Sequence, residues 1–143
     1  MNYKNIVYVS HPYGGDKENR DKVENLIQQL QQMFPSYLFI SPISAFSFLY
    51  DVTEYQEGLN MCLWLLDKCD EMWVFGEYED SVGCMSEIAY CQNYLIPYHI
   101  IGQSCLGIRE TPCRKCYECG LIDYYDYTIS CQIKKVRKIY DEL

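Results

Sequence analysis

The chain alternates short apolar runs with longer segments in which apolar residues recur at helical spacing. Four apolar runs are typical of buried strands, at residues 6–10, 37–40, 71–75 and 98–101. Helical spacing and end signals predict helices at about residues 16–34, 55–68, 83–93 and 130–143. Strands that alternate with helices favour a parallel sheet. We therefore expect an α/β fold with a Rossmann-like parallel sheet and flanking helices.

The segment after the second predicted strand lacks a clear period, and we expect a long loop there, running through Pro42 and several aromatic residues. Beyond Gly102 the composition shifts toward cysteine and tyrosine. The chain is therefore divided into an α/β domain over residues 1–102 and a cysteine-rich C-terminal extension over residues 103–143, which we expect to pack on that domain.

The size and charge of the chain exclude several classes of function. It has 143 residues, of which 49% are hydrophobic, and a net charge of −8. No basic stripe occurs in the first 100 residues, so a nucleic-acid polymer is not an expected partner. No apolar run is long enough to span a membrane, and no signal peptide is recognised at the N-terminus. A small molecule fits this composition better than a polymer or a membrane.

Nine cysteines without a secretion signal favour reduced thiols and a cytoplasmic location. Free thiols are the simplest interpretation, so no cofactor is predicted. A zinc site or an iron–sulfur cluster is the alternative for the four thiols of the extension, Cys105, Cys113, Cys116 and Cys119. The remaining cysteines of the α/β domain lie at helical or helix-end spacings and are interpreted as small core residues: Cys62, Cys69, Cys84 and Cys91.

A candidate site begins where the third strand leads into the third helix. Ser81 can cap that helix, and Gly83 allows a ligand to approach the backbone closely. Helix N-termini favour anions because their first N–H groups are unpaired. Glu87 follows about a turn and a half into the helix. An anion site beside a potential nucleophile suits a small phosphorylated or ribosylated molecule.

The other parts of this site follow from the expected sheet. In open α/β sheets, ligands bind beyond the carboxyl ends of the strands. That edge would gather the turn at residues 10–15, the loop after Ile40, the loop at residues 76–81 and the start of the third helix. The site would therefore draw on Tyr8, Gly14, Gly15, Ser81 and Glu87 together.

These motifs resemble a known family. Residues 6–10 with the following glycine pair, the strand entry at residues 69–71, and the pattern Ser81-x-Gly83-x3-Glu87 are similar to the nucleoside 2-deoxyribosyltransferase superfamily. That superfamily includes the 2′-deoxynucleoside 5′-phosphate N-hydrolases. The likeness covers roughly residues 5–101, and it implies a dimer or larger homo-oligomer.

The resemblance implies a role for each matching residue. Glu87 would attack the anomeric carbon of the sugar, and Tyr8 would orient its carboxylate. The 5′-phosphate would be held by Gly14, Gly15, Arg20 and Ser81. Apart from the resemblance, Ser10, His11 and Gly83 are candidate ligand contacts because they lie at the turn after the first strand or at the start of the third helix. One position departs from the family, because Cys62 stands where an aspartate serves as general acid toward the leaving base. A thiol is a poor substitute for that acid.

Two functions are therefore carried forward. The first is an enzyme that cleaves or transfers the N-glycosidic bond of a nucleoside 5′-phosphate or related nucleotide. The second is a non-catalytic protein that senses or sequesters a nucleotide-derived signal, of the cyclic nucleotide or ADP-ribose type. More ordinary interpretations stand beside individual residues: a helix cap for Ser81, a turn for the glycine pair, a solvated charge for Arg20, and a satisfied core residue for His99. Four aromatic residues are expected in the core or a dimer contact, namely Phe46, Phe48, Tyr50 and Trp64.

Overall fold

A four-stranded parallel sheet forms the centre of the protein. The computed structural model describes residues 3–101 and 132–143. The strands lie in the order β2-β1-β3-β4, and every neighbouring pair is parallel. Their bounds are β1 (Asn5–Ser10), β2 (Tyr37–Ile40), β3 (Glu71–Val74) and β4 (Tyr98–Ile100). The predicted α/β fold with a parallel sheet is confirmed.

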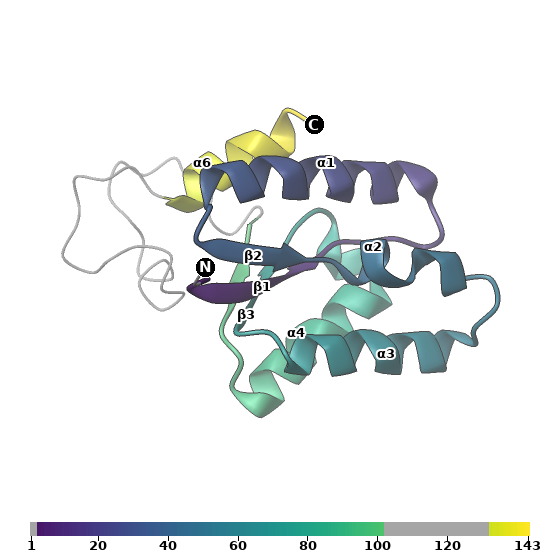
Figure 1. The fold of residues 1–143 in the computed structure, drawn as a ribbon. Coiled ribbons are helices and arrows are strands. Elements are labelled where there is room, and N and C mark those ends of the chain that lie inside the picture. Colours follow the sequence, from purple (N-terminus) through teal and green to yellow (C-terminus); the bar gives the residue numbers. More distant parts are fainter. Residues whose placement is uncertain (1–2, 102–131) are drawn as a thin grey trace.

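Helices cover both faces of this sheet. The helices are α1 (Lys17–Met33), α2 (Pro42–Phe46), α3 (Tyr55–Asp67), α4 (Val82–Tyr94) and α6 (Gln132–Asp141), with the 3₁₀ turns η1 (Ser47–Leu49) and η2 (Tyr78–Asp80). Helices α1 and α6 lie on one face, and α3 and α4 lie on the other (Figure 1). Within the described residues, no helix is both long enough and apolar enough to cross a membrane.

Local signals account for where the helices begin and end. The side chain of Asp16 accepts a hydrogen bond from the Glu18 amide at 2.8 Å and so caps α1. Phe34 ends that helix directly before a proline. The Ser81 side chain caps α4 by accepting from the Cys84 amide at 3.2 Å. The longer helices were predicted to within two residues, and for α1 and α4 the capping side chains stand in the sequence.

The loop predicted after β2 is wrong, because the chain forms α2 and η1 there. The Ser41 side chain accepts from the amides of Ile43 and Ser44, at 3.1 and 3.4 Å. Pro42 occupies the first turn, where its missing N–H costs nothing. A capping serine followed by proline is a helix-start signal, but a five-residue helix is too short to show a period.

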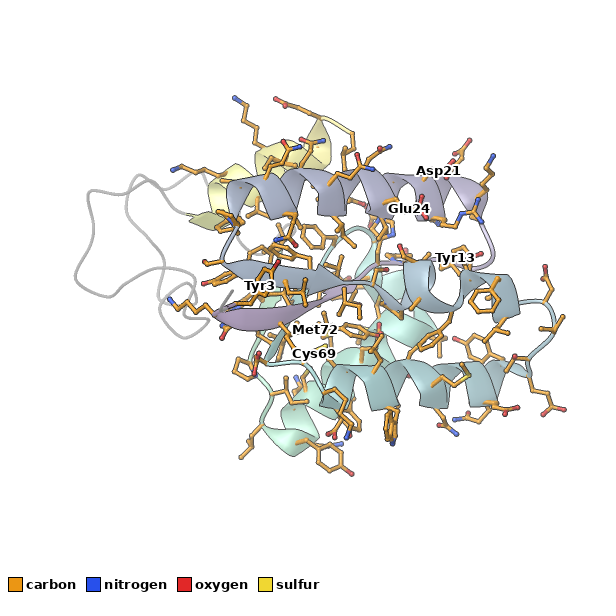
Figure 2. All side chains as sticks on the ribbon, viewed as in Figure 1. Tyr3, Tyr13, Asp21, Glu24, Cys69 and Met72 are labelled. Carbon is orange, nitrogen blue, oxygen red and sulfur yellow. The ribbon has the colours of Figure 1, made fainter. Side chains whose placement is uncertain are left out.

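Each face of the sheet has its own core. Residues of α1, the sheet and α6 form the first, which includes Leu26, Trp73 and Val136. Met72 and Cys69 belong to the second, between the sheet and α3 and α4 (Figure 2). The full set of buried hydrophobic residues in the second core is Tyr8, Leu66, Cys69, Met72, Val74, Ile88 and Cys91. The fully buried Val136 anchors α6 in the first core.

Three of the four aromatic residues expected in the core or in a dimer contact lie outside the core, and a dimer contact for them stays a prediction. Phe48 is 76% exposed, Trp64 69% and Tyr50 41%. The Lys68 ammonium lies 4.4 Å from the centre of the Trp64 ring, so this ring packs against a cation at the surface. The cysteine-rich part of the extension, with the four thiols considered for zinc, lies outside the described residues.

Candidate functional site

A pocket of about 570 Å³ opens at the carboxyl end of the sheet. It is lined by the segment after β1, by α2 and η1, by the first turns of α3 and by the start of α4. From β1 the chain adds β2 on one side of the sheet and then adds β3 and β4 on the other side. The order of strand addition therefore reverses between β1 and β3. Ligands of open α/β folds bind at this kind of switch point.

A buried carboxylate stands at the inner end of this pocket. Glu87 comes from α4, lines the pocket and is 5% exposed. Its two oxygens have different partners on β1: the Tyr8 hydroxyl donates to Oε2, and the Ser10 hydroxyl donates to Oε1 at 2.8 Å. Both donors are fully buried. The structure therefore brings together Tyr8, Ser10 and Glu87, with the carboxylate fixed by two hydroxyl groups.

Burial changes the acidity of this cluster. Desolvation raises the pKa of Glu87 to about 7, although the hydrogen bonds from Tyr8 and Ser10 act in the opposite direction. Burial and the nearby Glu87 raise the pKa of Tyr8 well above its usual value, so the phenol remains a donor. A carboxyl group that titrates near neutral pH in a pocket is typical of functional sites.

The raised pKa predicts a pH-dependent stability. The folded protein holds a proton on Glu87 between pH 4.5 and about 7, where the unfolded chain has lost it. Stability should therefore fall as the pH rises through this range, by about 3 kcal/mol for this group. Chemical denaturation of the wild type and of Glu87→Gln from pH 5 to pH 8 measures it. We expect the variant to gain stability relative to the wild type as the pH rises. A constant difference between the two proteins would contradict the raised pKa.

Cys62, on α3, places its thiol near the Glu87 carboxylate. Burial, and then the charge of Glu87, raise the pKa of Cys62 to about 11, although a hydrogen bond with Tyr8 lowers it. The group is therefore a neutral thiol at pH 7. It stands at the position that the resemblance assigns to a general acid, and its high pKa makes it a weak proton donor.

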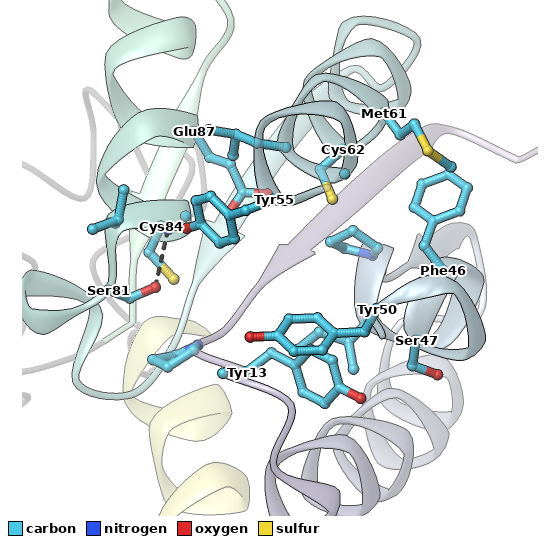
Figure 3. A pocket seen from close by; sticks show the side chains of 18 of the residues that line it. Tyr13, Phe46, Ser47, Tyr50, Tyr55, Met61, Cys62, Ser81, Cys84 and Glu87 are labelled. Atoms are coloured by element: carbon cyan, nitrogen blue, oxygen red, sulfur yellow. Dashed lines mark hydrogen bonds between the residues drawn. The ribbon is translucent and has the colours of Figure 1, made fainter. Parts of the chain in front are cut away.

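Aromatic side chains form the walls of the pocket. Figure 3 shows Tyr13 and Tyr50 facing Tyr55 and Glu87 across the cavity. The rings of Tyr13 and Tyr50 contact each other edge to face, with centroids 5.0 Å apart. Phe46 extends the same wall from α2. Aromatic walls beside the buried Glu87 cluster suit a flat, partly apolar ligand.

The start of α4 supplies the polar edge of the pocket. Ser81 and Gly83 both line it, and a Cβ atom built on Gly83 would meet only the Ser81 hydroxyl oxygen, at 3.8 Å. Ligand atoms therefore have room to approach the backbone at Gly83. The first amides of a helix are suited to an anion or to a sugar hydroxyl.

The two adjacent glycines have different roles. Both have positive φ, 60° at Gly14 and 78° at Gly15, which explains why glycine stands there. Gly14 lines the pocket, and the space beside its Cα is open. At Gly15 a Cβ atom would lie 2.9 Å from the Tyr50 ring. Gly15 is therefore required by the packing of Tyr50, and of the two only Gly14 faces the cavity.

Two other candidates are placed differently from the expectation. Arg20 is on α1, outside the pocket lining, and its guanidinium lies 3.9 Å from the Asp21 carboxylate. His11 lines the pocket, but both of its ring nitrogens already have protein partners. Tyr13 lies within the turn at residues 10–15 that was predicted to belong to the site. Tyr55 was not predicted as a lining residue, and its position at the start of a predicted helix was the available signal.

Fold and pocket together define an α/β domain with a pocket at its topological switch point. Residues 5–101 match the model of a family described as "Domain of unknown function (DUF7768)", and the chain belongs to that family. No curated protein and no solved structure gives a significant match. The likeness to nucleoside 2-deoxyribosyltransferases stays a prediction from the motifs.

Proposed function

We propose that this pocket binds a nucleoside 5′-phosphate or a related nucleotide and cleaves or transfers its N-glycosidic bond. The observation that carries the proposal is Glu87, a buried carboxylate that lines the pocket and is held by two hydroxyl donors on β1. A fixed, partly desolvated carboxylate beside a cavity is the arrangement that a nucleophile at an anomeric carbon needs.

The proposed reaction has two steps. In the first, a carboxylate oxygen of Glu87 bonds to the anomeric carbon while the C–N bond breaks and the base leaves with the electron pair. The base takes up a proton from solvent, since the neutral Cys62 thiol, with a pKa of about 11, is a weak donor. In the second step, water or another base attacks the same carbon, the bond between that carbon and the Glu87 oxygen breaks with its electron pair returning to the carboxylate, and the proton of the attacking group passes to solvent. Tyr8 and Ser10 orient Glu87 throughout.

Other groups that line the pocket support a nucleotide ligand. Tyr50 and Tyr55 offer aromatic surface for a base. The start of α4 with Ser81 and Gly83, together with the open Gly14, offers hydroxyl and backbone groups for a phosphate or a ribose. The same groups suit a ligand that is bound without being cleaved.

A second candidate function follows from Cys62. With a thiol in place of the aspartate that the resemblance assigns to the leaving base, the pocket would serve a protein that senses or sequesters a nucleotide-derived signal, of the cyclic nucleotide or ADP-ribose type, although the carboxylates of Glu54 and Asp80 also line it. The thiol at this position, with its raised pKa, is the observation that favours this candidate.

One experiment separates the two candidates. The purified protein is incubated with a panel of nucleosides, nucleoside 5′-phosphates and nucleotide signals, and the protein and the filtrate are then analysed by mass spectrometry. Free base together with sugar or sugar phosphate supports the glycosidic reaction. An intact ligand that leaves the protein only on denaturation supports sequestration. Neither product nor bound ligand across the panel would contradict both.

A further inference from the structure

The C-terminal helix reaches the residue at which β1 enters the pocket. The Nε2 atom of His11 lies 2.7 Å from the Tyr140 hydroxyl on α6, and its Nδ1 atom lies 2.7 Å from the Pro12 carbonyl oxygen. The imidazole is 7% exposed and lines the pocket. Both of its nitrogen atoms are therefore occupied, one by its own loop and one by a helix 129 residues away in the sequence.

These two contacts fix the positions of the protons. A carbonyl oxygen only accepts hydrogen bonds, so Nδ1 of His11 must donate to Pro12. In the neutral ring, Nε2 then accepts from the Tyr140 hydroxyl. Burial lowers the pKa of His11, which favours the neutral ring, and it raises the pKa of Tyr140 to about 12, which keeps its phenol protonated. Lys22, on α1, disfavours a charge on His11 as well.

The surroundings of Tyr140 are built to hold it in this position. Its ring packs on Phe75, with centroids 5.5 Å apart, and the Lys22 ammonium lies 4.4 Å from the ring centre. Gly76 has φ of 74°, and a Cβ atom there would lie 2.9 Å from the Tyr140 hydroxyl oxygen and 3.3 Å from His11 Nε2. The glycine thus leaves the space that the His11–Tyr140 hydrogen bond occupies. Val136, fully buried, fixes the helix itself.

We propose that Tyr140 is a positioning residue for the pocket: through His11 it holds the segment Pro12–Gly14 at the pocket wall. Three consecutive lining residues, Pro12, Tyr13 and Gly14, follow the histidine that it contacts. Helix α6 lies outside the stretch of residues 5–101 that matches the family. In this chain the pocket would therefore depend on a helix outside the matched stretch. This role does not require the glycosidic reaction.

The first test is spectroscopic and needs no ligand. The chain has two histidines, so ¹⁵N correlation spectra of the imidazoles are assigned with a single His99 variant. We expect His11 to be the neutral tautomer with its proton on Nδ1 at pH 7. A proton on Nε2, or averaging between the tautomers, would overturn the proposal.

The second test is the Tyr140→Phe variant, which removes one hydroxyl and keeps the ring that packs on Phe75. The Asp16 amide, which donates to the Tyr13 carbonyl at 3.0 Å, reports on the segment. Loss of the hydrogen bond between Tyr140 and His11 should speed hydrogen exchange at the Asp16 amide about fivefold. Tyr90→Phe is the matched control, because it removes a hydroxyl that donates to Asp67 at an exposed position on α4.

Equal exchange at Asp16 in the two variants would overturn the proposal. A ligand found with the nucleotide panel adds a third comparison, in which Tyr140→Phe should bind it about fivefold more weakly than Tyr90→Phe does. Equal affinity would also count against the role. Because the tautomer and exchange experiments use the protein alone, failure of the panel would bear on the proposed function and not on Tyr140.

Discussion

Replacing Glu87 with glutamine is expected to lower base release by about a thousandfold or more, because an amide oxygen does not form the glycosyl ester. The fold should survive. Glutamine has the same shape, and its amide can still pair with the hydroxyls of Tyr8 and Ser10, which both donate and accept. The variant also removes the cost of burying a charge at this site. The rate of base release from the best substrate of the panel, measured with a circular dichroism melt, tests the prediction.

Glu57→Gln provides a matched control. Glu57 is exposed on α3, outside the pocket lining, so the same substitution should leave base release unchanged. If Glu87→Gln keeps more than about a tenth of the wild-type rate while Glu57→Gln keeps all of it, Glu87 binds the ligand without attacking it. That result would exclude the nucleophilic role.

The fold could be predicted because its signals are local. Each strand is a short apolar run, and the caps of α1 and α4 are side chains that stand beside the amides they accept from. The contact between Tyr8 and Glu87 follows from one rule: β1 and β3 are parallel and end at the same edge of the sheet, and α4, which carries Glu87, follows β3. Alternation within β1 then places Tyr8 and Ser10 on the same face of the sheet, toward α4.

The features that could not be predicted depend on distant packing. The requirement for glycine at residue 15 becomes clear only from the Tyr50 ring that covers it. The His11–Tyr140 contact joins two ends of the chain, and no pattern in the sequence marks it. The motif at residues 69–71 belongs to the resemblance, yet it lies at the entry to β3 and outside the pocket lining. There the Asp70 carboxylate accepts from the Ile6 amide at 2.7 Å and helps to join two strands.

Glu71 gives the clearest case of a polar residue that serves the fold. It is 7% exposed, and three side chains bind its carboxylate: Asn5 Nδ2 at 2.7 Å, Trp73 Nε1 at 3.0 Å and His99 Nε2 at 2.8 Å. Burial alone would raise the pKa of Glu71, but the hydrogen bonds from His99, Trp73 and Asn5 outweigh it and lower the pKa. His99 is thus a buried core residue, as predicted, although its Nδ1 atom has no hydrogen-bond partner among residues 3–101 and 132–143.

Glu71→Ala is therefore expected to destabilise the protein by about 3 kcal/mol or more, because each buried donor left unpaired costs about 1–3 kcal/mol. The substitution would leave the Trp73 N–H and the His99 ring unpaired within the core. Urea denaturation at pH 7 measures the loss. Glu24→Ala, at an exposed position on α1, is the control and should change stability by less than about 0.5 kcal/mol.

The pH dependence of the same variant provides an independent check. Because the pKa of Glu71 is lowered in the folded protein, the stability that this group contributes should be present at neutral pH and lost as the pH falls through its folded pKa. The difference between the wild type and Glu71→Ala should therefore shrink in acid. If Glu71→Ala does not fold, Glu71→Gln, which keeps one acceptor for the Trp73 N–H, should show a smaller loss with the same pH trend. A Glu71→Ala protein within about 1 kcal/mol of the wild type would show that water replaces the carboxylate and that the cluster does not stabilise the sheet.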